Sequence, residues 1–248
     1  MVIASRFFPI RINIRQYQEG SMNPQYFGDG HDLFKYDLIL TIMSQVKPQL
    51  KSFMFIPMLT EYRPLKKDAI AGMKNKKLGK CFNKFYGGKG AAKYFKEIKQ
   101  YFESEDIKTN IFPDLVFSQK SRSEYFEKIF SNIPKKSLIF LDPDTGLQAD
   151  EKAEKQHLKF SELQEMFERI DDDSILMVYQ HFYRDRKTIP NFPAHMESLV
   201  EKHIKERPLC ISDNSIMFLF LTKNENLRKN LEMVLNQYKE QYPKSFKK

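Results

Sequence analysis

Short runs of apolar residues alternate along the chain with segments in which apolar residues recur every three or four positions. The short runs, bounded by polar residues, predict buried strands, and the wider spacing predicts amphipathic helices. Strands are expected at 53–60, 111–117, 137–141, 174–179, 209–212 and 215–221. Helices are expected at 32–45, 91–102, 121–130, 161–170, 194–205 and 226–239, with Ser161 as the N-cap of the fourth.

The regular alternation of strands with helices favours an α/β fold: a Rossmann-like, mostly parallel sheet flanked by helices. Asp213-Asn214 joins the last two strands and is typical of a hairpin turn, which predicts an antiparallel strand at or beside the edge of the sheet. Residues 22–248 are expected to form one α/β domain with a basic insertion, rich in Gly and Lys, near 62–90. Residues 1–21 stop just before Met22, and we expect them to be a dispensable extension.

Composition narrows the class of protein. Hydrophobic residues make up 41% of the 248 residues, and 22 Phe with 12 Tyr supply enough apolar surface for a packed core. No segment approaches the ~20 apolar residues that span a bilayer, so no membrane association is expected. Cys81 and Cys210 lie far apart and match no zinc-binding spacing. This cysteine usage indicates a reducing compartment and predicts a cytoplasmic location.

Positive charge is concentrated in one region. The net charge is +9, and Lys66–Lys99 holds eleven lysines against Asp68 and Glu97. A cationic surface attracts polyanions, so RNA or DNA is the candidate partner of this region. The alternative is that these lysines form an ordinary solvated surface.

Polar residues directly follow three of the predicted strands. They are Thr60 and Glu61, Asp142 and Asp144, and Gln180 and His181; the first helix adds His31, Asp32 and Lys35. Because ligands of an open α/β sheet bind beyond the carboxyl ends of its strands, these side chains predict one polar pocket. Structural alternatives exist: Pro143-Asp144-Thr145-Gly146 is a good turn sequence, His181 would be a hydrogen-bonded structural group, and Lys35 a solvated lysine.

A mostly parallel sheet that ends in a hairpin resembles the fold of the S-adenosylmethionine-dependent methyltransferases. Amino-methylating members carry an Asp/Asn-Pro-Pro-Tyr/Phe turn, and this chain has Asp142-Pro143-Asp144-Thr145, without the second proline and the aromatic residue. One family of ribosomal RNA adenine-N6 methyltransferases opens with an Asp-x-x-Lys-His helix, which Asp32-Leu33-Phe34-Lys35-Tyr36 resembles.

The resemblance implies S-adenosylmethionine as the cofactor and a nucleic acid or a nucleotide as the substrate. Lys35 would contact the carboxylate of the cofactor, and Asp142 would accept a hydrogen bond from the target amine. The remaining cofactor-binding candidates are His31, Asp32, Thr60 and Glu61, and the remaining catalytic candidates are Asp144 and His181.

The chain departs from the family after the first strand, where methyltransferases have a glycine-rich turn. No glycine occurs here before Gly72, and Gly87–Gly90 is the other candidate for a cradle of backbone N–H groups. Glycine is required where the backbone must approach a ligand very closely. The position of a cofactor-binding turn is therefore left open.

Two further functions fit the same residues. In one, Asp142 and Asp144, with Glu61 or Asp32, bind Mg²⁺ through oxygen ligands while His181 acts as a general acid or base. This arrangement would hydrolyse a phosphodiester or a nucleotide. In the other, the chain is a non-catalytic module that binds nucleic acid.

Overall fold

The computed structural model describes residues 30–58, 91–112, 122–148, 157–182, 189, 191–213 and 215–242. Within these ranges the chain forms an α/β fold with a six-stranded sheet. The strands are β1 (Ser52–Met58), β2 (Lys108–Ile111), β3 (Ser137–Pro143), β4 (Ile175–His181), β5 (Leu209–Ser212) and β6 (Ile216–Leu221). The helices are α1 (Gly30–Gln45), α3 (Ala91–Ser104), α4 (Arg122–Phe130), α5 (Phe160–Arg169), α6 (Phe192–Ile204) and α7 (Glu225–Gln241).

The sheet has the order β2-β1-β3-β4-β6-β5. The first four of these strands are parallel, whereas β6 is antiparallel to both β4 and β5. The final strand therefore lies between the fourth strand and the edge strand β5. This confirms the predicted fold class, including the antiparallel hairpin strand beside the edge.

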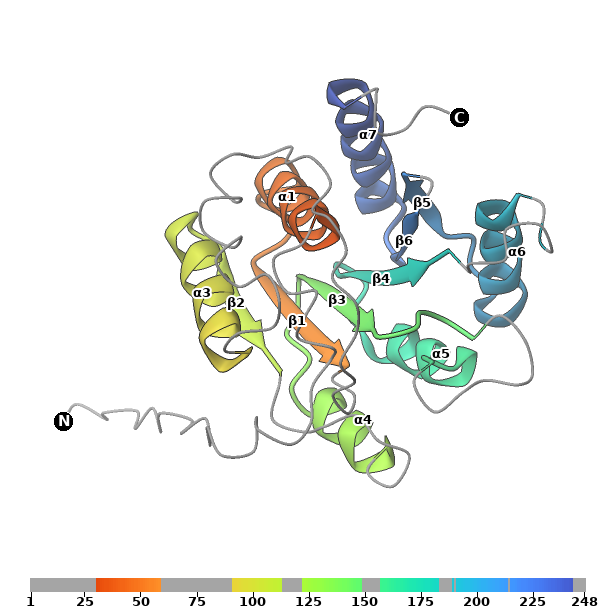
Figure 1. Ribbon diagram of the computed structural model, residues 1–248, viewed down its shortest axis with the longest axis horizontal. Coiled ribbons are helices and arrows are strands. Elements are labelled where there is room, and N and C mark those ends of the chain that lie inside the picture. Colours follow the sequence, from red (N-terminus) through yellow and green to blue (C-terminus); the bar gives the residue numbers. More distant parts are fainter. Residues whose placement is uncertain are drawn as a thin grey trace.

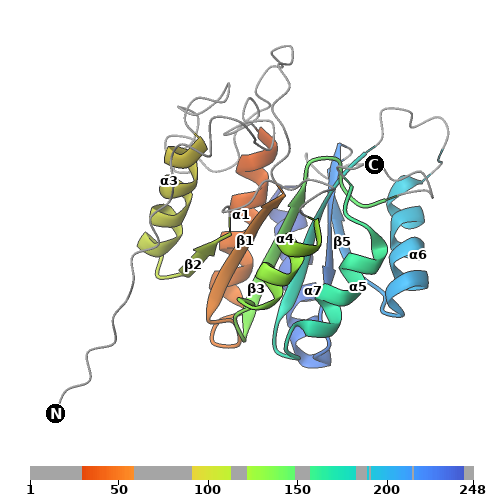
Figure 2. The same cartoon turned by 90° about the horizontal axis from the view of Figure 1, so that it is seen from below.

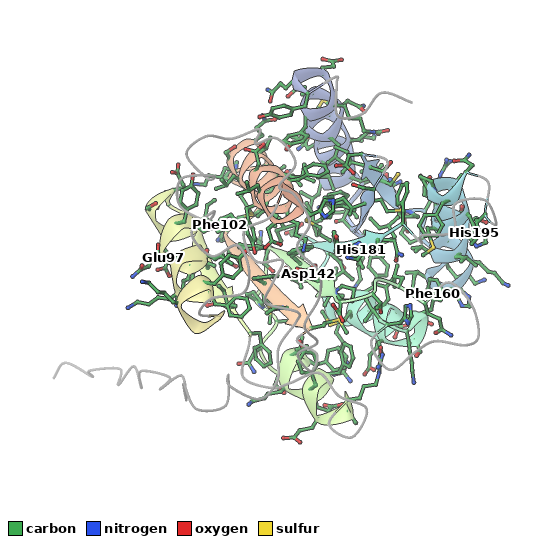
Figure 3. The ribbon with its side chains drawn as sticks, viewed as in Figure 1. Glu97, Phe102, Asp142, Phe160, His181 and His195 are labelled. Atoms are coloured by element: carbon green, nitrogen blue, oxygen red, sulfur yellow. The ribbon has the colours of Figure 1, made fainter. Side chains whose placement is uncertain are left out.

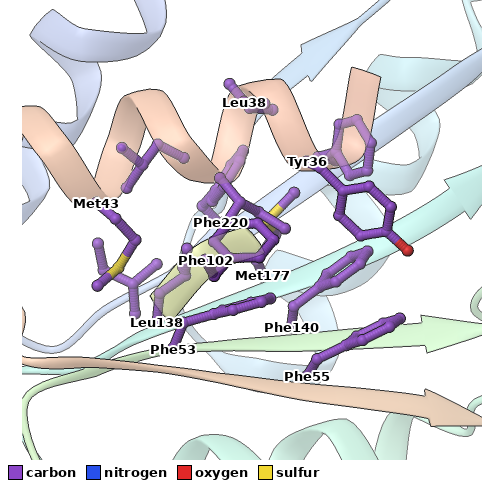
Figure 4. Close-up of a cluster of buried hydrophobic side chains, with 14 of the residues drawn as sticks. Tyr36, Leu38, Met43, Phe53, Phe55, Phe102, Leu138, Phe140, Met177 and Phe220 are labelled. Atoms are coloured by element: carbon purple, nitrogen blue, oxygen red, sulfur yellow. The ribbon is translucent and has the colours of Figure 1, made fainter. Parts of the chain in front are cut away.

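Helices cover both faces of the sheet, as Figures 1 and 2 show. Successive strand residues point to opposite faces, so each strand contributes to two cores. Phe53, Phe55 and Phe140 pack with α1, α3 and α7 on one face, as seen in Figure 4. Phe55 and Phe140 stack with their ring centroids 5.4 Å apart. The alternate residues of the same strands pack with α4, α5 and α6 on the other face.

Helix α1 is buried over most of its surface because it lies between α3 and α7 and against the sheet (Figure 1). Every residue from position 32 to position 39 is buried. A helix that is buried on all sides cannot turn its polar residues to solvent. Asp32, Lys35 and Asp37 are at most 6% exposed, so each needs a polar partner inside the protein.

Two sequence predictions are wrong in detail. The second strand was expected to begin at 111, but β2 is Lys108–Ile111, where it pairs in parallel with β1; residues 113–117 of the predicted segment lie outside the described residues. Ser161 is not an N-cap: α5 begins at Phe160, and the Glu162 side chain accepts a hydrogen bond from the backbone N–H of Lys159 at 2.9 Å.

Some predictions fall outside the described residues. They concern the extension at 1–21, most of the basic region Lys66–Lys99, and the Gly87–Gly90 cluster. In the described part of the chain, no helix is long and apolar enough to cross a membrane.

Candidate functional site

Asp142 is the last residue but one of β3 and pairs in register with Pro57 of β1. Strand alternation points its side chain to the same face as Phe140, toward α1. Only 1% of its surface is exposed. A buried carboxylate is costly unless it is paired and hydrogen-bonded, so the contacts of Asp142 define the site.

The partner of Asp142 is Lys35. The Lys35 Nζ atom lies 2.9 Å from Oδ2 of Asp142 and 3.2 Å from Oδ1 of Asp32. Asp32 and Lys35 are three residues apart on α1, which places them on the same side of the helix. The ammonium also lies 4.1 Å from the centroid of the Tyr179 ring, in a cation–π contact. One buried lysine is thus held by two carboxylates and an aromatic face.

Asp32 is fixed by a second hydrogen bond. Tyr94 of α3 donates its phenolic proton to Oδ2 of Asp32 at 2.5 Å, and the Tyr36 and Tyr94 hydroxyls are 2.9 Å apart. Both tyrosines are fully buried. Burial and the nearby charge of Asp32 keep the pKa of Tyr94 well above its usual value, so the phenol stays protonated and acts as the donor.

The pKa of Asp142 is raised to about 6. Burial is the largest cause, because it penalises the charged form; the negative charges of Asp32 and Asp144 act in the same direction. Lys35 opposes them by its charge and its hydrogen bond. The carboxyl is therefore ionised above neutral pH, but it binds a proton more readily than a solvent-exposed aspartate does.

His181 lies at the end of β4, on the same face as Tyr179. Its ring is 3.1 Å from the Tyr179 hydroxyl, measured at Nε2, and 6.4 Å from the His31 ring between centroids. The pKa of His181 is lowered to about 3, first by burial and then by the charges of Lys35 and His31. A neutral imidazole at this position can share a hydrogen bond, but it holds no second proton to donate as an acid near neutral pH.

His31 lies at the outer side of this group. Its Nε2 atom is 3.2 Å from the Ser215 hydroxyl, and that hydroxyl donates to Oδ1 of Asp213 at 2.7 Å. The hairpin between β5 and β6 thereby contacts the first turn of α1. Figure 3 shows Asp142 and His181 near the centre of the molecule, below the N-terminal end of α1 in this view.

The structure thus brings together five of the residues singled out from the sequence: His31, Asp32, Lys35, Asp142 and His181. We call these five, with Tyr94 and Tyr179, the carboxyl-edge cluster. Asp144 lies just past β3 and is partly exposed; its charge acts on Asp142. Thr60 and Glu61 lie outside the described residues.

Gln180 does not join the cluster, contrary to the prediction from its place at a strand end. Its Oε1 atom accepts the backbone N–H of Leu147 at 2.6 Å, and its Nε2 atom donates to the carbonyl of His181. The side chain lies so close to Gly146 that a Cβ atom there would be 2.6 Å from Oε1, and Gly146 has φ +87°. Gln180 therefore fixes the loop after β3 rather than lining the site.

Thr145 of the same loop has an unsatisfied hydroxyl. Its Oγ1 atom is buried and has no hydrogen-bond partner among the described residues. Buried hydroxyls are normally paired, so this atom is a candidate ligand contact three residues after Asp142.

The Mg²⁺ alternative required Asp142 to share an ion with other carboxylates. In the described part of the chain, no group of three or more His, Cys, Asp or Glu side chains has an arrangement that could hold a metal ion. Asp32 and Asp142 instead share the Lys35 ammonium.

Sequence reasoning missed Tyr94 and Tyr179 of the cluster and Tyr36, which contacts Tyr94. Tyr36 and Tyr94 follow the apolar spacing of their helices, and Tyr179 sits in an apolar run, so each looked like core. A usable signal was present, because a buried tyrosine hydroxyl usually requires a polar partner.

The chain was compared with protein-family models, with curated proteins and with solved structures, and none of them matches it.

Proposed function

We propose that this chain is a diverged methyltransferase-like transferase that acts on a nucleic acid or a nucleotide, with its site at the carboxyl ends of β3 and β4. The observation that carries the proposal is the 2.9 Å contact between Lys35 and Asp142, across 107 positions of sequence. These two residues come from the two short motifs on which the resemblance to methyltransferases rests. Their direct contact is what a shared site requires.

The topology supports the same proposal. The last strand, β6, runs antiparallel between β4 and β5, while the first four strands are parallel. This is the hairpin ending on which the resemblance to the methyltransferase fold was based. A fold can host many functions, so the residues of the site decide between them.

The side chains of the site are complementary in charge to the polar groups of S-adenosylmethionine. The Lys35 ammonium is complementary to a carboxylate, the Asp32 carboxylate to an ammonium, and the unpaired Thr145 hydroxyl can bind a further polar atom. When bound, this cofactor supplies an electrophilic methyl group. Methyl transfer by direct displacement depends mainly on alignment of the two reactants, so few acid or base groups are needed.

Asp142 would position the acceptor. Its buried carboxylate can accept a hydrogen bond from an N–H of the target amine and so orient the nitrogen lone pair. The raised pKa strengthens this role, because the carboxylate then has a higher proton affinity than a solvated one. Neutral His181 and Tyr179 form the wall beside it and place no further charge near the acceptor.

The exposed side of α3, the helix that contributes Tyr94 to the site, is basic and supports a polyanionic substrate. Lys93, Lys96 and Lys99 of α3 carry the positive charge of the Lys66–Lys99 region onto a described helix, and all three are exposed. Lys99 lies 3.8 Å from Glu103, which offsets part of its charge. Tyr94, on the same helix, contacts the site directly.

A transfer assay tests the proposal. The protein is incubated with S-adenosylmethionine carrying a labelled methyl group and with pools of RNA or DNA, in the presence of EDTA. We expect label to enter one pool, and we expect Asp142→Asn to abolish the transfer. Asp37→Asn is the control, because Asp37 is likewise a buried carboxylate but belongs to α1, where it accepts a hydrogen bond from Tyr238 at 2.8 Å and lies outside the carboxyl-edge cluster.

Two results would contradict the proposal. One is the absence of transfer from S-adenosylmethionine to RNA, DNA or nucleotides. The other is cleavage of these substrates that requires Mg²⁺ or Mn²⁺ and is lost in Asp142→Asn, which would favour the hydrolase.

A further inference from the structure

We propose that Tyr94 is a positioning residue for this site: by holding one oxygen of Asp32, it directs the Lys35 ammonium toward Asp142. The inference depends on the proposed function for the identity of the ligand. The role of Tyr94 itself depends only on the geometry of the cluster.

The number of phenolic protons fixes the direction of the hydrogen bonds. A tyrosine hydroxyl has one proton, and Tyr94 donates it to Asp32 at 2.5 Å. In the 2.9 Å contact between the two phenols, Tyr36 must therefore be the donor and Tyr94 the acceptor. The protons of this chain thus point from Tyr36 to Tyr94 and from Tyr94 to Asp32.

The two carboxylate oxygens of Asp32 have different partners. Oδ2 accepts from Tyr94, and Oδ1 accepts from Lys35 at 3.2 Å. The contact of Lys35 with Asp142 is shorter, 2.9 Å. The hydrogen bond from Tyr94 stabilises part of the negative charge of Asp32. Asp32 therefore attracts the Lys35 ammonium less strongly, and the ammonium lies closer to Asp142 than to Asp32.

Removal of the Tyr94 hydroxyl should change how strongly Asp32 and Asp142 each attract the Lys35 ammonium. Asp32 then loses a short hydrogen bond in a buried environment, where such bonds are strong. Its carboxylate draws Lys35 more closely, and Asp142 loses part of the charge that stabilises its ionised form. The pKa of Asp142 should then rise above its already elevated value.

The chain provides a matched control on the same helix. Tyr238 of α7 donates to Oδ2 of Asp37 at 2.8 Å, and both Tyr238 and Asp37 are buried. Tyr238→Phe therefore removes a bond of the same chemical type from the same helix. The described contacts of Lys35 with carboxylates are to Asp32 and Asp142, so this variant leaves them in place.

The test compares the wild type with Tyr94→Phe, Tyr36→Phe and Tyr238→Phe. The pKa of Asp142 is measured by ¹³C NMR of its side-chain carboxyl during a pH titration. We expect a rise of roughly half a unit or more in Tyr94→Phe, a smaller rise in Tyr36→Phe, and an unchanged value in Tyr238→Phe. In calorimetry, Tyr94→Phe should weaken the binding of S-adenosylhomocysteine by about tenfold, and Tyr238→Phe should not.

The outcomes separate the two proposals. An Asp142 pKa that is unchanged or lowered in Tyr94→Phe overturns the positioning role, whatever the ligand does. Failure of the wild type to bind S-adenosylhomocysteine overturns the cofactor assignment, while the titration still decides the role of Tyr94. If Tyr94→Phe does not fold, the Tyr36→Phe titration decides it: a rise supports the role and an unchanged value contradicts it.

Discussion

The Nζ atom of Lys35 lies 2.9 Å from Oδ2 of Asp142, and both side chains are almost completely buried. The contact ties the first helix to the end of the third strand, at the edge where an open α/β sheet binds its ligands. A buried ion pair is weak evidence for stability, because removing two charges from water costs about as much as their attraction returns. The cluster is therefore better explained by function, and its energetic cost is measurable.

Replacing Asp142 by Asn should make the fold more stable above neutral pH. The pKa of Asp142 is raised from 3.8 to about 6, so between these values the folded chain binds more protons at this carboxyl than the unfolded chain does. Its contribution to the free energy of unfolding therefore falls as the pH rises through this window, by on the order of 3 kcal/mol in total. In urea unfolding at pH values from ~4 to ~8, the stability of Asp142→Asn relative to the wild type should therefore rise with pH by this amount. Groups such as His181 titrate in both proteins and cancel in the difference.

The comparison with Asp37→Asn isolates the effect, because Asp37 is similarly buried but is bonded to Tyr238. An Asp142→Asn variant that is less stable than the wild type above neutral pH, with the same pH dependence, would show that Asp142 serves the stability of the fold.

Replacing Lys35 by Met should have the opposite effect. It leaves the buried carboxylates of Asp32 and Asp142 without their shared cation, and such uncompensated burial costs about 3–5 kcal/mol. The loss should shrink as the pH falls toward about 6, because Asp142 without Lys35 takes up its proton at a higher pH than it does in the wild type. Chemical denaturation on both sides of this pH measures the difference.

Lys136→Met provides the comparison for that experiment. Lys136 also forms an ion pair, with Asp173 at 3.1 Å, but both side chains are close to half exposed. An exposed pair contributes about 1 kcal/mol or less. Equal losses in the two variants would contradict the account of a buried, functional lysine.

His181 should stay neutral across the physiological range. Its pKa is lowered to about 3 by burial and by the charges of Lys35 and His31. Because the folded-state pKa is depressed, the stability tied to this group is present above about pH 6.5 and is lost as the pH falls toward 3. The ¹⁵N chemical shifts of the His181 ring should therefore be constant from about pH 5 to 8. A change of these shifts with pH in this range would contradict the prediction and support a role of His181 as a general acid or base.

The exposed lysines of α3 should contribute to nucleic-acid binding. If Lys93 and Lys96 contact phosphates, replacing both by Gln should flatten the slope of log affinity against log salt by up to ~0.9 per lost contact on duplex. Lys202 of α6 and Lys229 of α7 are exposed elsewhere on the molecule, and the same change there should leave the slope unaltered. Equal slopes in both double variants would show that the α3 lysines do not contact nucleic acid and are ordinary solvated residues.

The α/β architecture could be predicted from the sequence because the spacing of apolar residues distinguishes most strands from most helices. β4 and α7 match the predicted segments to within two residues at each end. β2 was displaced because its four residues, KTNI, carry little apolar signal, and pairing with β1 sets its position. Such an edge strand is specified by tertiary contacts rather than by its own pattern.

The site was predictable in part. Strand ends and the α1 motif pointed to Asp142, Lys35 and His181, but only the packing of α1 over the sheet creates the contact between Lys35 and Asp142. Gln180 was misplaced although strand alternation separates it from His181 and sends it to the opposite face. Tyr94 was missed because its helical spacing is that of a core residue, although its hydroxyl, once buried, requires a polar partner.

The central claim is that the carboxyl-edge cluster binds a methyl-donor cofactor through Lys35. The most direct measurement is a calorimetric titration of the protein with S-adenosylhomocysteine in EDTA. We predict saturable binding that Lys35→Ala weakens by about tenfold or more, equivalent to ~1.4 kcal/mol, and that Lys136→Ala leaves unchanged. Absence of binding to the wild type, or equal affinity of Lys35→Ala and the wild type, would contradict the account.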